Sequence, residues 1–223
     1  MGSEMCIRDS ITIGQSPRVD VVPEIKPYLG DVEIIECGAL DGLTLEEIKE
    51  LAPKEGDYVL VSRLRDGTQV RLGREKIVKR LQECVKKLEK EVDVIGVLCT
   101  GEFPELKSQK LLIEPSLLLL KTVEALGVSN FGVIVPDPEQ IETTKRKWSS
   151  IANTIKVQSV SPYTGKEEDL IRAAQKLKDC DLIVMDCIGY TISSKRIVKE
   201  VTKKPVVLPR TLIARVIGEL LEG

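Results

Sequence analysis

Two cysteines occur in matching sequence contexts and could carry out chemistry together. Cys99 ends the apolar run 93–99, and Cys187 ends the apolar run 181–187. In both runs an aspartate stands six places before the cysteine and a glycine two places after it. Such runs predict buried strands that end at the cysteine. Because ligands bind beyond the carboxyl ends of the strands in an open α/β sheet, the two thiols are placed for chemistry.

The absence of histidine narrows the chemistry that these thiols could share. It excludes Ser-His-Asp and Cys-His catalysis and removes imidazole as a metal ligand. Proton transfer would fall to Cys, Asp, Glu, Lys or Tyr side chains. The chain has six cysteines without a C-x-x-C pair or a regular spacing, so we expect neither a metal site nor a disulfide framework. We expect reduced thiols, with Cys37, Cys84 and Cys180 as small buried hydrophobic residues.

Strands and helices are expected to alternate along the chain, which is typical of parallel-sheet α/β proteins. The apolar patterns predict strands that begin near residues 11, 32, 58, 93, 131, 155, 181 and 205. Helices are expected over 75–90, 115–126, 140–150, 166–178 and 212–221. Two further helices are expected, one that begins at the capping box 44–47 and one after residue 193. The pair Asp66-Gly67 predicts a hairpin turn.

The order of helix, strand-end cysteine and helix occurs twice. We therefore expect an α/β fold of two pseudo-symmetric, parallel-sheet, Rossmann-like (flavodoxin-like) halves with the site between them. The first half would comprise residues 11–112 together with 208–223, and the second residues 113–207. Residues 1–10 show neither a signal-peptide pattern nor a helical period. They are expected to be a non-native or disordered leader, which includes Cys6.

The composition excludes two classes of partner. With 33 basic and 35 acidic residues, the formal net charge is −2, and 3% of the residues are aromatic. Neither a phosphate-binding face nor a base-stacking platform is indicated, so we expect no nucleic-acid partner. No apolar run approaches the roughly 18 residues that span a bilayer, so we expect no membrane segment and a cytoplasmic location.

Several motifs between Ile11 and the C-terminus, in this order, resemble those of the AroM family. They are Ile13-Gly-Gln-Ser-Pro-Arg18, Ala39-Leu-Asp-Gly42, Ser62-Arg-Leu-Arg-Asp-Gly-Thr68, Leu98-Cys-Thr-Gly-Glu-Phe-Pro104, Ser161-Pro-Tyr163 and Asp186-Cys-Ile-Gly-Tyr-Thr191. The AroM family is similar in layout to the aspartate/glutamate racemase superfamily. Members of that superfamily place one catalytic cysteine in each of two pseudo-symmetric α/β halves.

The resemblance implies cofactor-independent proton transfer at a carbon next to the carboxylate of a small molecule. Cys99 and Cys187 match the two catalytic cysteines, so one thiolate would remove a proton while the opposite thiol returns one. A free thiol has a pKa of about 8.5, and a helix N-terminus or a nearby cation would lower it. No cofactor is implied, and pairing of two copies as a homodimer is a plausible default for such a fold.

Residues in the turns that follow Cys99 and Cys187 are candidates for substrate binding. Donors that would stabilise an enediolate-like transition state are expected from Thr100, Gly101, Gly189 and Thr191. Tyr190 would either close the pocket or pack in the core.

The loop 14–18 replaces the Asp-Ser-Gly type of loop in the racemases. Gln15 and Ser16 are ligand candidates there. Arg18 would either bind an additional carboxylate or pair with Asp20, and Arg63 would act as a second anchor or remain a solvated loop charge.

The departures from the racemase pattern leave several functions open. Cys99-Thr-Gly and Cys187-Ile-Gly stand where racemases usually have Asn-Thr and Thr-His after their cysteines. We consider a racemase or isomerase with two cysteines, a lyase or cis-trans isomerase that uses one cysteine, and a metabolite-binding protein without activity. A redox pair formed by Cys99 and Cys187 is a lesser alternative.

Overall fold

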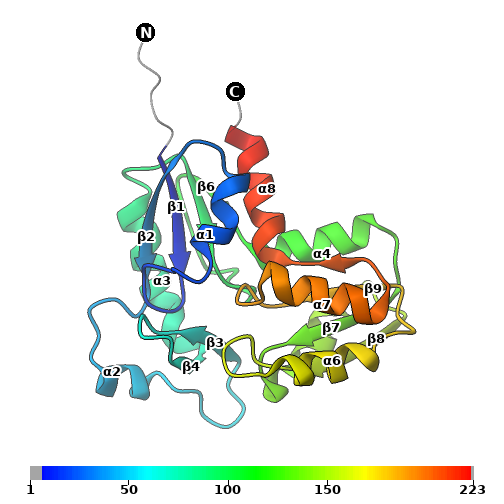
Figure 1. Cartoon of the computed structure of the whole chain (residues 1–223). Coiled ribbons are helices and arrows are strands. Elements are labelled where there is room, and N and C mark those ends of the chain that lie inside the picture. The colour runs from blue at the N-terminus through cyan, green and yellow to red at the C-terminus, as the bar shows by residue number, and fades with distance from the viewer. Residues whose placement is uncertain (1–6, 222–223) are drawn as a thin grey trace.

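Two parallel four-stranded sheets form the framework of the protein (Figure 1). The computed structural model describes residues 7–221. The first sheet has the strand order β2-β1-β5-β6 and the second the order β10-β9-β7-β8, with parallel neighbours in both. The strands are β1 (Ile7–Thr12), β2 (Glu33–Gly38), β5 (Val94–Val97), β6 (Leu111–Ile113), β7 (Asn130–Val135), β8 (Thr154–Ser159), β9 (Leu182–Met185) and β10 (Val206–Val207). The expected α/β fold with two parallel-sheet halves is confirmed.

Helices cover both faces of each sheet and bury separate apolar clusters. In the first half, α3 packs on one face, while α1, η1 and α8 pack on the other. In the second half, α6 and α7 cover one face and α4 and α5 the other. The helices are α1 (Val22–Ile25), η1 (Lys26–Tyr28), α2 (Leu45–Glu50), α3 (Arg74–Leu88), α4 (Pro115–Ala125), η2 (Pro138–Gln140), α5 (Ile141–Trp148), α6 (Glu167–Gln175), α7 (Ile192–Thr202) and α8 (Pro209–Leu221).

The C-terminal helix α8 returns from the second sheet and packs on the first half, as Figure 1 shows. Its residues Ile213, Ala214 and Ile217 join the apolar cluster on the face of the first sheet opposite α3. Gly218 allows a close approach, because a Cβ atom there would lie 2.2 Å from the carbonyl oxygen of Tyr28. The helix therefore connects the two halves.

A hairpin of β3 (Val59–Arg63) and β4 (Gln69–Gly73) forms a separate antiparallel sheet. Its turn contains Gly67 with a φ of +94°, so the hairpin signal of Asp66-Gly67 is confirmed. The hairpin contacts the loop after β1, where the backbone N–H of Gln15 donates to the carbonyl of Arg63 at 3.4 Å. The hairpin thus lies beside the carboxyl end of the first sheet.

Two local expectations are wrong. Strand β1 begins at Ile7 and not near Ile11, since residues 7–10 pair with residues 33–36 of β2. The rest of the expected leader, with Cys6, lies outside the described residues. Residues 111–113, for which no strand is expected, form the edge strand β6. The segment between Cys99 and β6 is an irregular loop, and the expected helix begins at Pro115.

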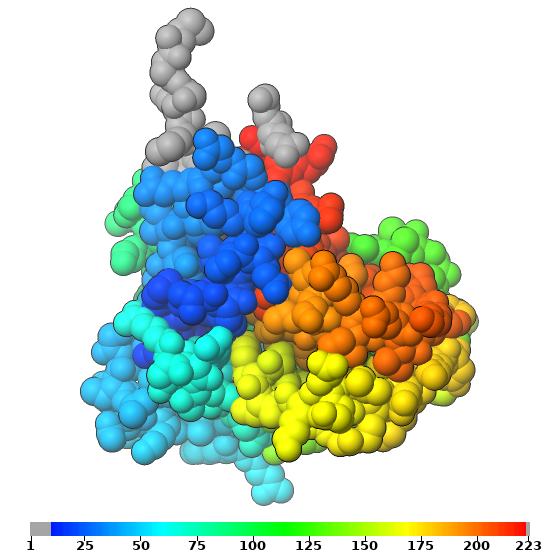
Figure 2. Space-filling view, viewed as in Figure 1, coloured from blue at the N-terminus to red at the C-terminus, as the bar shows by residue number. Residues whose placement is uncertain are grey.

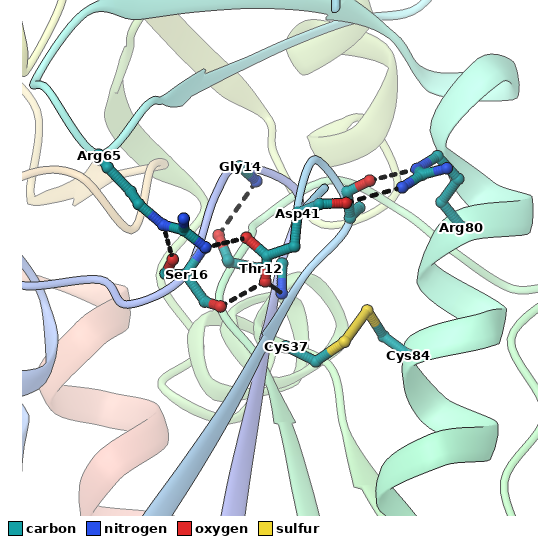
Figure 3. The surroundings of a disulfide bond; sticks show 10 residues. Thr12, Gly14, Ser16, Cys37, Asp41, Arg65, Arg80 and Cys84 are labelled. Atoms are coloured by element: carbon teal, nitrogen blue, oxygen red, sulfur yellow. Dashed lines mark hydrogen bonds and ion pairs between the residues drawn. A yellow bond between two sulfur atoms is a disulfide. The ribbon is translucent and has the colours of Figure 1, made fainter. Parts of the chain in front are cut away.

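Cys37 and Cys84 are joined by a disulfide bond, so the expectation of reduced, unpaired thiols is wrong for these two residues. Cys37 lies near the end of β2 and Cys84 on α3, which covers that face, with 5.7 Å between their Cα atoms. This separation suits a disulfide. Figure 3 shows the bond beneath the loop that carries Asp41. Cys180 is a buried free thiol, as expected.

Within residues 7–221, no helix combines the length and the apolar character needed to cross a bilayer.

Reduction of the Cys37 to Cys84 bond should lower the free energy of unfolding by about 2–4 kcal/mol. The physical reason is that the bond restricts the unfolded chain across a sequence separation of 47 residues. Urea unfolding of the wild type with and without a phosphine reductant measures the difference. The C37S/C84S double variant is the control, because its stability should not respond to the reductant. Equal urea midpoints for the oxidised and reduced wild type would contradict the bond.

Candidate active site

A small cavity lies between the two halves, and both strand-end cysteines line it. Its volume is about 40 Å³, which is room for roughly three water molecules. The first half contributes Arg18, Tyr58, Leu60, Val61, Ser62, Leu98, Cys99, Thr100 and Gly101. The second half contributes Val135, Pro136, Gln140, Thr143, Thr144, Lys147, Tyr163, Asp186, Cys187 and Ile188. Cys99, Cys187, Arg18, Thr100 and Gly101 are therefore brought together as expected.

The hairpin and the segment after β8 close one side of this cavity. Ser161 Oγ donates to the side-chain oxygen of Gln69 on β4. Figure 2 shows the corresponding contact at the surface, where the segment around residue 165 lies against the first half. Behind it, Tyr163 lines the cavity, and its hydroxyl oxygen accepts a hydrogen bond of 3.1 Å from Arg18.

The Cys99 thiol follows β5 and is held by the glycine two residues later. The backbone N–H of Gly101 donates to Cys99 Sγ at 3.3 Å. Burial raises the pKa of Cys99 to about 11, against the lowering effects of the Gly101 N–H, Lys147 and Arg18, while Asp186 adds to the rise. The expectation of a lowered thiol pKa is therefore wrong, because the thiol is desolvated and no helix begins after it.

The Cys187 thiol has the equivalent environment in the second half. The backbone N–H of Gly189 donates to Cys187 Sγ at 3.4 Å. Burial raises the pKa of Cys187 to about 12, against the lowering effect of the Gly189 N–H, and Cys99 raises it further. Because the charge of Cys99 acts on the pKa of Cys187, the two thiols lie close enough to interact.

The geometry explains the repeated Cys-x-Gly pattern. Each glycine turns its N–H toward a sulfur atom and has no space for a side chain. A Cβ atom at Gly101 would lie 2.7 Å from Leu60 Cδ2, and one at Gly189 would lie 2.6 Å from the Tyr163 hydroxyl oxygen. Gly189 itself does not line the cavity, so its contribution is through the Cys187 thiol.

Arg18 is a buried charge with partners within the protein. Its guanidinium makes a bidentate ion pair with Asp20 at 2.9 and 2.8 Å and also donates to Thr12 and Tyr163. Burial opposes the charged form, but Asp20 and Tyr163 outweigh it and hold the pKa of Arg18 above its ordinary value. The expected pairing with Asp20 is observed, and a role of Arg18 in binding a carboxylate stays a prediction.

Three expected ligands near the first loop lie outside the cavity lining. Gln15 Oε1 accepts from the backbone N–H of Arg65 at 3.0 Å, and the Ser16 hydroxyl donates to Asp41. Figure 3 shows Ser16 facing Asp41. Arg63 lies beside the hairpin turn, where its charge lowers the pKa values of Asp20 and Asp66 as a minor effect. These residues fix the loops around the site.

Two residues after Cys187 expected to bind the substrate, Tyr190 and Thr191, contact other parts of the protein and do not line the cavity. The hydroxyl of Tyr190 donates to the carbonyl of Val160 at 2.6 Å, and its ring is buried in the apolar cluster of the second half. Thr191 is the N-cap of α7, because its Oγ1 accepts from the backbone N–H of Ser194 at 3.0 Å. Tyr190 therefore packs in the core, and Thr191 begins a helix.

Lys147 and Asp186 form a buried ion pair at the cavity, and the sequence did not indicate it. Lys147 Nζ lies 3.0 and 3.2 Å from the two carboxylate oxygens of Asp186, and both side chains are 5% exposed. Lys147 also donates to the carbonyl of Thr100 at 3.2 Å. Trp148 Nε1 donates to the same carboxylate at 3.0 Å. In α5, Lys147 follows two other basic residues, so its type and spacing alone do not distinguish it from surface lysines.

Two polar atoms of residues that line the cavity have no hydrogen-bond partner within the protein. They are Ser62 Oγ and Gln140 Oε1, both buried. The orientation of the Gln140 amide is fixed, because its Nε2 donates to the carbonyl of Val59 at 3.0 Å. A buried polar atom without a partner costs about 1–3 kcal/mol. Both atoms are available to a bound molecule.

No cluster of three or more acidic or cysteine side chains suited to hold a metal ion occurs in the part of the chain that the structure describes.

Comparison with solved structures identifies proteins that share this fold. Unliganded arylmalonate decarboxylase aligns with a TM-score of 0.63 at 16% identity, covering 98% of this chain and 94% of the other. The maleate isomerase Iso from Pseudomonas putida S16 gives 0.64 at 13% identity, with 98% and 93% covered. Glutamate racemase from Aquifex pyrophilus gives 0.61 at 14% identity, with 97% and 84% covered. The expected similarity in layout to the aspartate/glutamate racemases is confirmed.

A search of curated protein sequences finds no match. The sequence pattern of the AroM protein family matches residues 9–221, which span both halves and both cysteines. The chain therefore belongs to the AroM family.

Proposed function

We propose that the protein is a cofactor-independent enzyme that moves a proton at the carbon next to a carboxylate of a small metabolite. One observation carries this proposal: two thiols from equivalent strand ends of the two halves line the same cavity. The fold is shared with racemases, an isomerase and a decarboxylase, which supports a racemase-like or isomerase-like reaction. These similarities do not identify the substrate, which is part of the proposal.

The two thiols would act on opposite faces of the substrate carbon. The thiolate of Cys99 takes the proton from the carbon and becomes a thiol, and the electron pair of the broken bond moves into the carboxylate to form an enediolate. The thiol of Cys187 then donates its proton to the opposite face and becomes a thiolate. The enzyme returns to its starting state by the reverse reaction or by proton exchange with solvent.

The enediolate needs donors that are in place before the reaction. Four of the five guanidinium N–H groups of Arg18 have partners within the protein. The fifth is available to the substrate carboxylate, as is the hydroxyl of Ser62. The oxygen of Gln140 would accept a hydrogen bond from a hydroxyl, amine or amide group of the substrate. A small carboxylate that also carries such a donor fits these residues best.

The small volume of the cavity has a consequence for substrate entry. A volume of about 40 Å³ is less than a carboxylate metabolite occupies. We therefore expect the hairpin and the segment 161–165 to move apart when the substrate enters. This movement would break the hydrogen bond between the Ser161 hydroxyl and the side chain of Gln69.

Replacement of either cysteine should abolish proton exchange. We expect C99S and C187S each to lower the rate at least about a hundredfold, because a serine hydroxyl is a far weaker acid than a thiol and supplies almost no conjugate base near neutral pH. The measurement is deuterium incorporation from solvent into a panel of small carboxylates, read by mass spectrometry. C180S is the matched control, since Cys180 is a buried free thiol in the core of the second half.

The same experiment separates the alternatives. Loss of exchange in only one of the two variants would favour a lyase or cis-trans isomerase with a single catalytic cysteine. Saturable binding of a carboxylate without any exchange would favour a binding protein. Exchange that continues in both variants would rule out the proposed mechanism.

The rate of exchange should rise with pH. Burial raises the pKa values of Cys99 and Cys187 to about 11 and about 12, so the reactive thiolate is a small fraction at neutral pH. Below these values, each unit of pH increases that fraction tenfold. We expect kcat/KM to increase about tenfold per pH unit from pH 7 to pH 10. A plateau that begins near pH 8 would show that the thiolate forms much more readily than burial allows.

A further inference from the structure

Lys147 is connected to both cysteines through the residue next to each of them. Its ammonium group donates to the carbonyl of Thr100, which follows Cys99, and to the carboxylate of Asp186, which precedes Cys187. Thr100 Oγ1 in turn donates to the backbone carbonyl of Asp186 at 3.1 Å. Lys147 thus belongs to a hydrogen-bonded link between the strand ends of the two halves.

The ammonium group has no hydrogen left for a substrate. A lysine has three N–H donors, and the carbonyl of Thr100 and the two oxygens of Asp186 accept all three. The ammonium also lies 5.5 Å from the centroid of the Trp148 ring, within the range of a cation–π interaction. Lys147 therefore acts on the reaction through its charge and its fixed position and not by contact with the substrate.

We propose that Lys147 is a positioning residue of this site, which holds the two strand ends together and stabilises the thiolate of Cys99 in preference to that of Cys187. The first role follows from its hydrogen bonds to both halves. The second follows from the different partners of Lys147 at the two ends: its charge meets a neutral carbonyl beside Cys99 but is paired with the carboxylate of Asp186 beside Cys187. The inference rests on the proposed function, for which it names the thiol that acts as the base in the free enzyme.

The charged groups around the two thiols support this asymmetry. Cys99 faces Lys147, Arg18, Asp186 and Cys187, with the phenol of Tyr58 nearby. The positive charge of Lys147 is one of the main influences that lower the pKa of Cys99.

The charged groups around Cys187 favour its neutral thiol more than those around Cys99 do. It faces Cys99, Arg18 and Asp186, with the phenols of Tyr163 and Tyr190 against it. An ionised Cys99 further disfavours ionisation of Cys187. On this proposal the first proton is lost from Cys99.

The ionisation of the two thiols can be measured without a substrate. The full-length protein is labelled with ¹³C at the cysteine Cβ atoms, and the Cβ chemical shifts are followed by NMR from pH 7 to pH 10.5. In the wild type we expect Cys99 to respond before Cys187. In K147M we expect about tenfold less Cys99 thiolate at a given pH, because an adjacent positive charge is lost.

Further variants separate an electrostatic role from a purely structural one. D186N should shift Cys99 in the opposite direction and give more thiolate, because it removes a negative charge while Lys147 remains. K147R should restore the response of Cys99 to near the wild-type value. K145M is the matched control, since Lys145 is a half-exposed lysine of the same helix that pairs with Glu142, and it should leave both thiols unchanged.

The outcomes decide the inference independently of the proposed function. A Cys99 response that is unchanged in K147M, or that moves in the same direction in K147M and D186N, would overturn it. If backbone amide spectra show that K147M does not fold, D186N and K147R still give the decisive comparison. If the cysteines titrate as expected but the protein shows no exchange activity, the inferred difference between the two thiols stands and the proposed enzymatic function is rejected.

Discussion

The buried ion pair between Lys147 and Asp186 determines how the two thiols lie relative to each other. Removing two charges from water is costly, and the pair is stable only because further hydrogen bonds satisfy both groups. These bonds come from Trp148 and from the carbonyl of Thr100 in the other half. The requirement to satisfy a buried charge therefore joins the strand end that carries Cys99 to the one that carries Cys187.

A second buried cation makes the equivalent link on the other side of the site. Arg210 of α8 donates to the carbonyls of Ile188 and Gly189, which follow Cys187, and to Glu24 and the carbonyl of Asp20 in the first half. The loop after Cys187 is thus held by residues of both halves. Since α8 packs on the first sheet, the position of this thiol depends on the docking of the C-terminal helix.

Thiol chemistry at this site requires both stabilisation of a developing charge and formation of a thiolate, and burial favours the first but opposes the second. It removes water from the cavity, which strengthens the interaction of fixed donors with a developing charge. It also disfavours the thiolate, which raises the pKa values of both cysteines. The N–H groups of Gly101 and Gly189 compensate in part, because each donates to the sulfur two residues earlier. The Cys-x-Gly pattern in the sequence provides these N–H donors.

The sequence alone determined the two α/β halves and the two strand ends with their Cys-x-Gly turns, because these depend on local periodicity and on neighbouring residues. Only the tertiary structure decided the disulfide between Cys37 and Cys84, the burial of Lys147 and the internal partners of Arg18. The disulfide and the Lys147 ion pair join residues 47 and 39 positions apart in the chain. Such pairings follow from how helices pack on sheets and how the halves meet, and no local pattern encodes them.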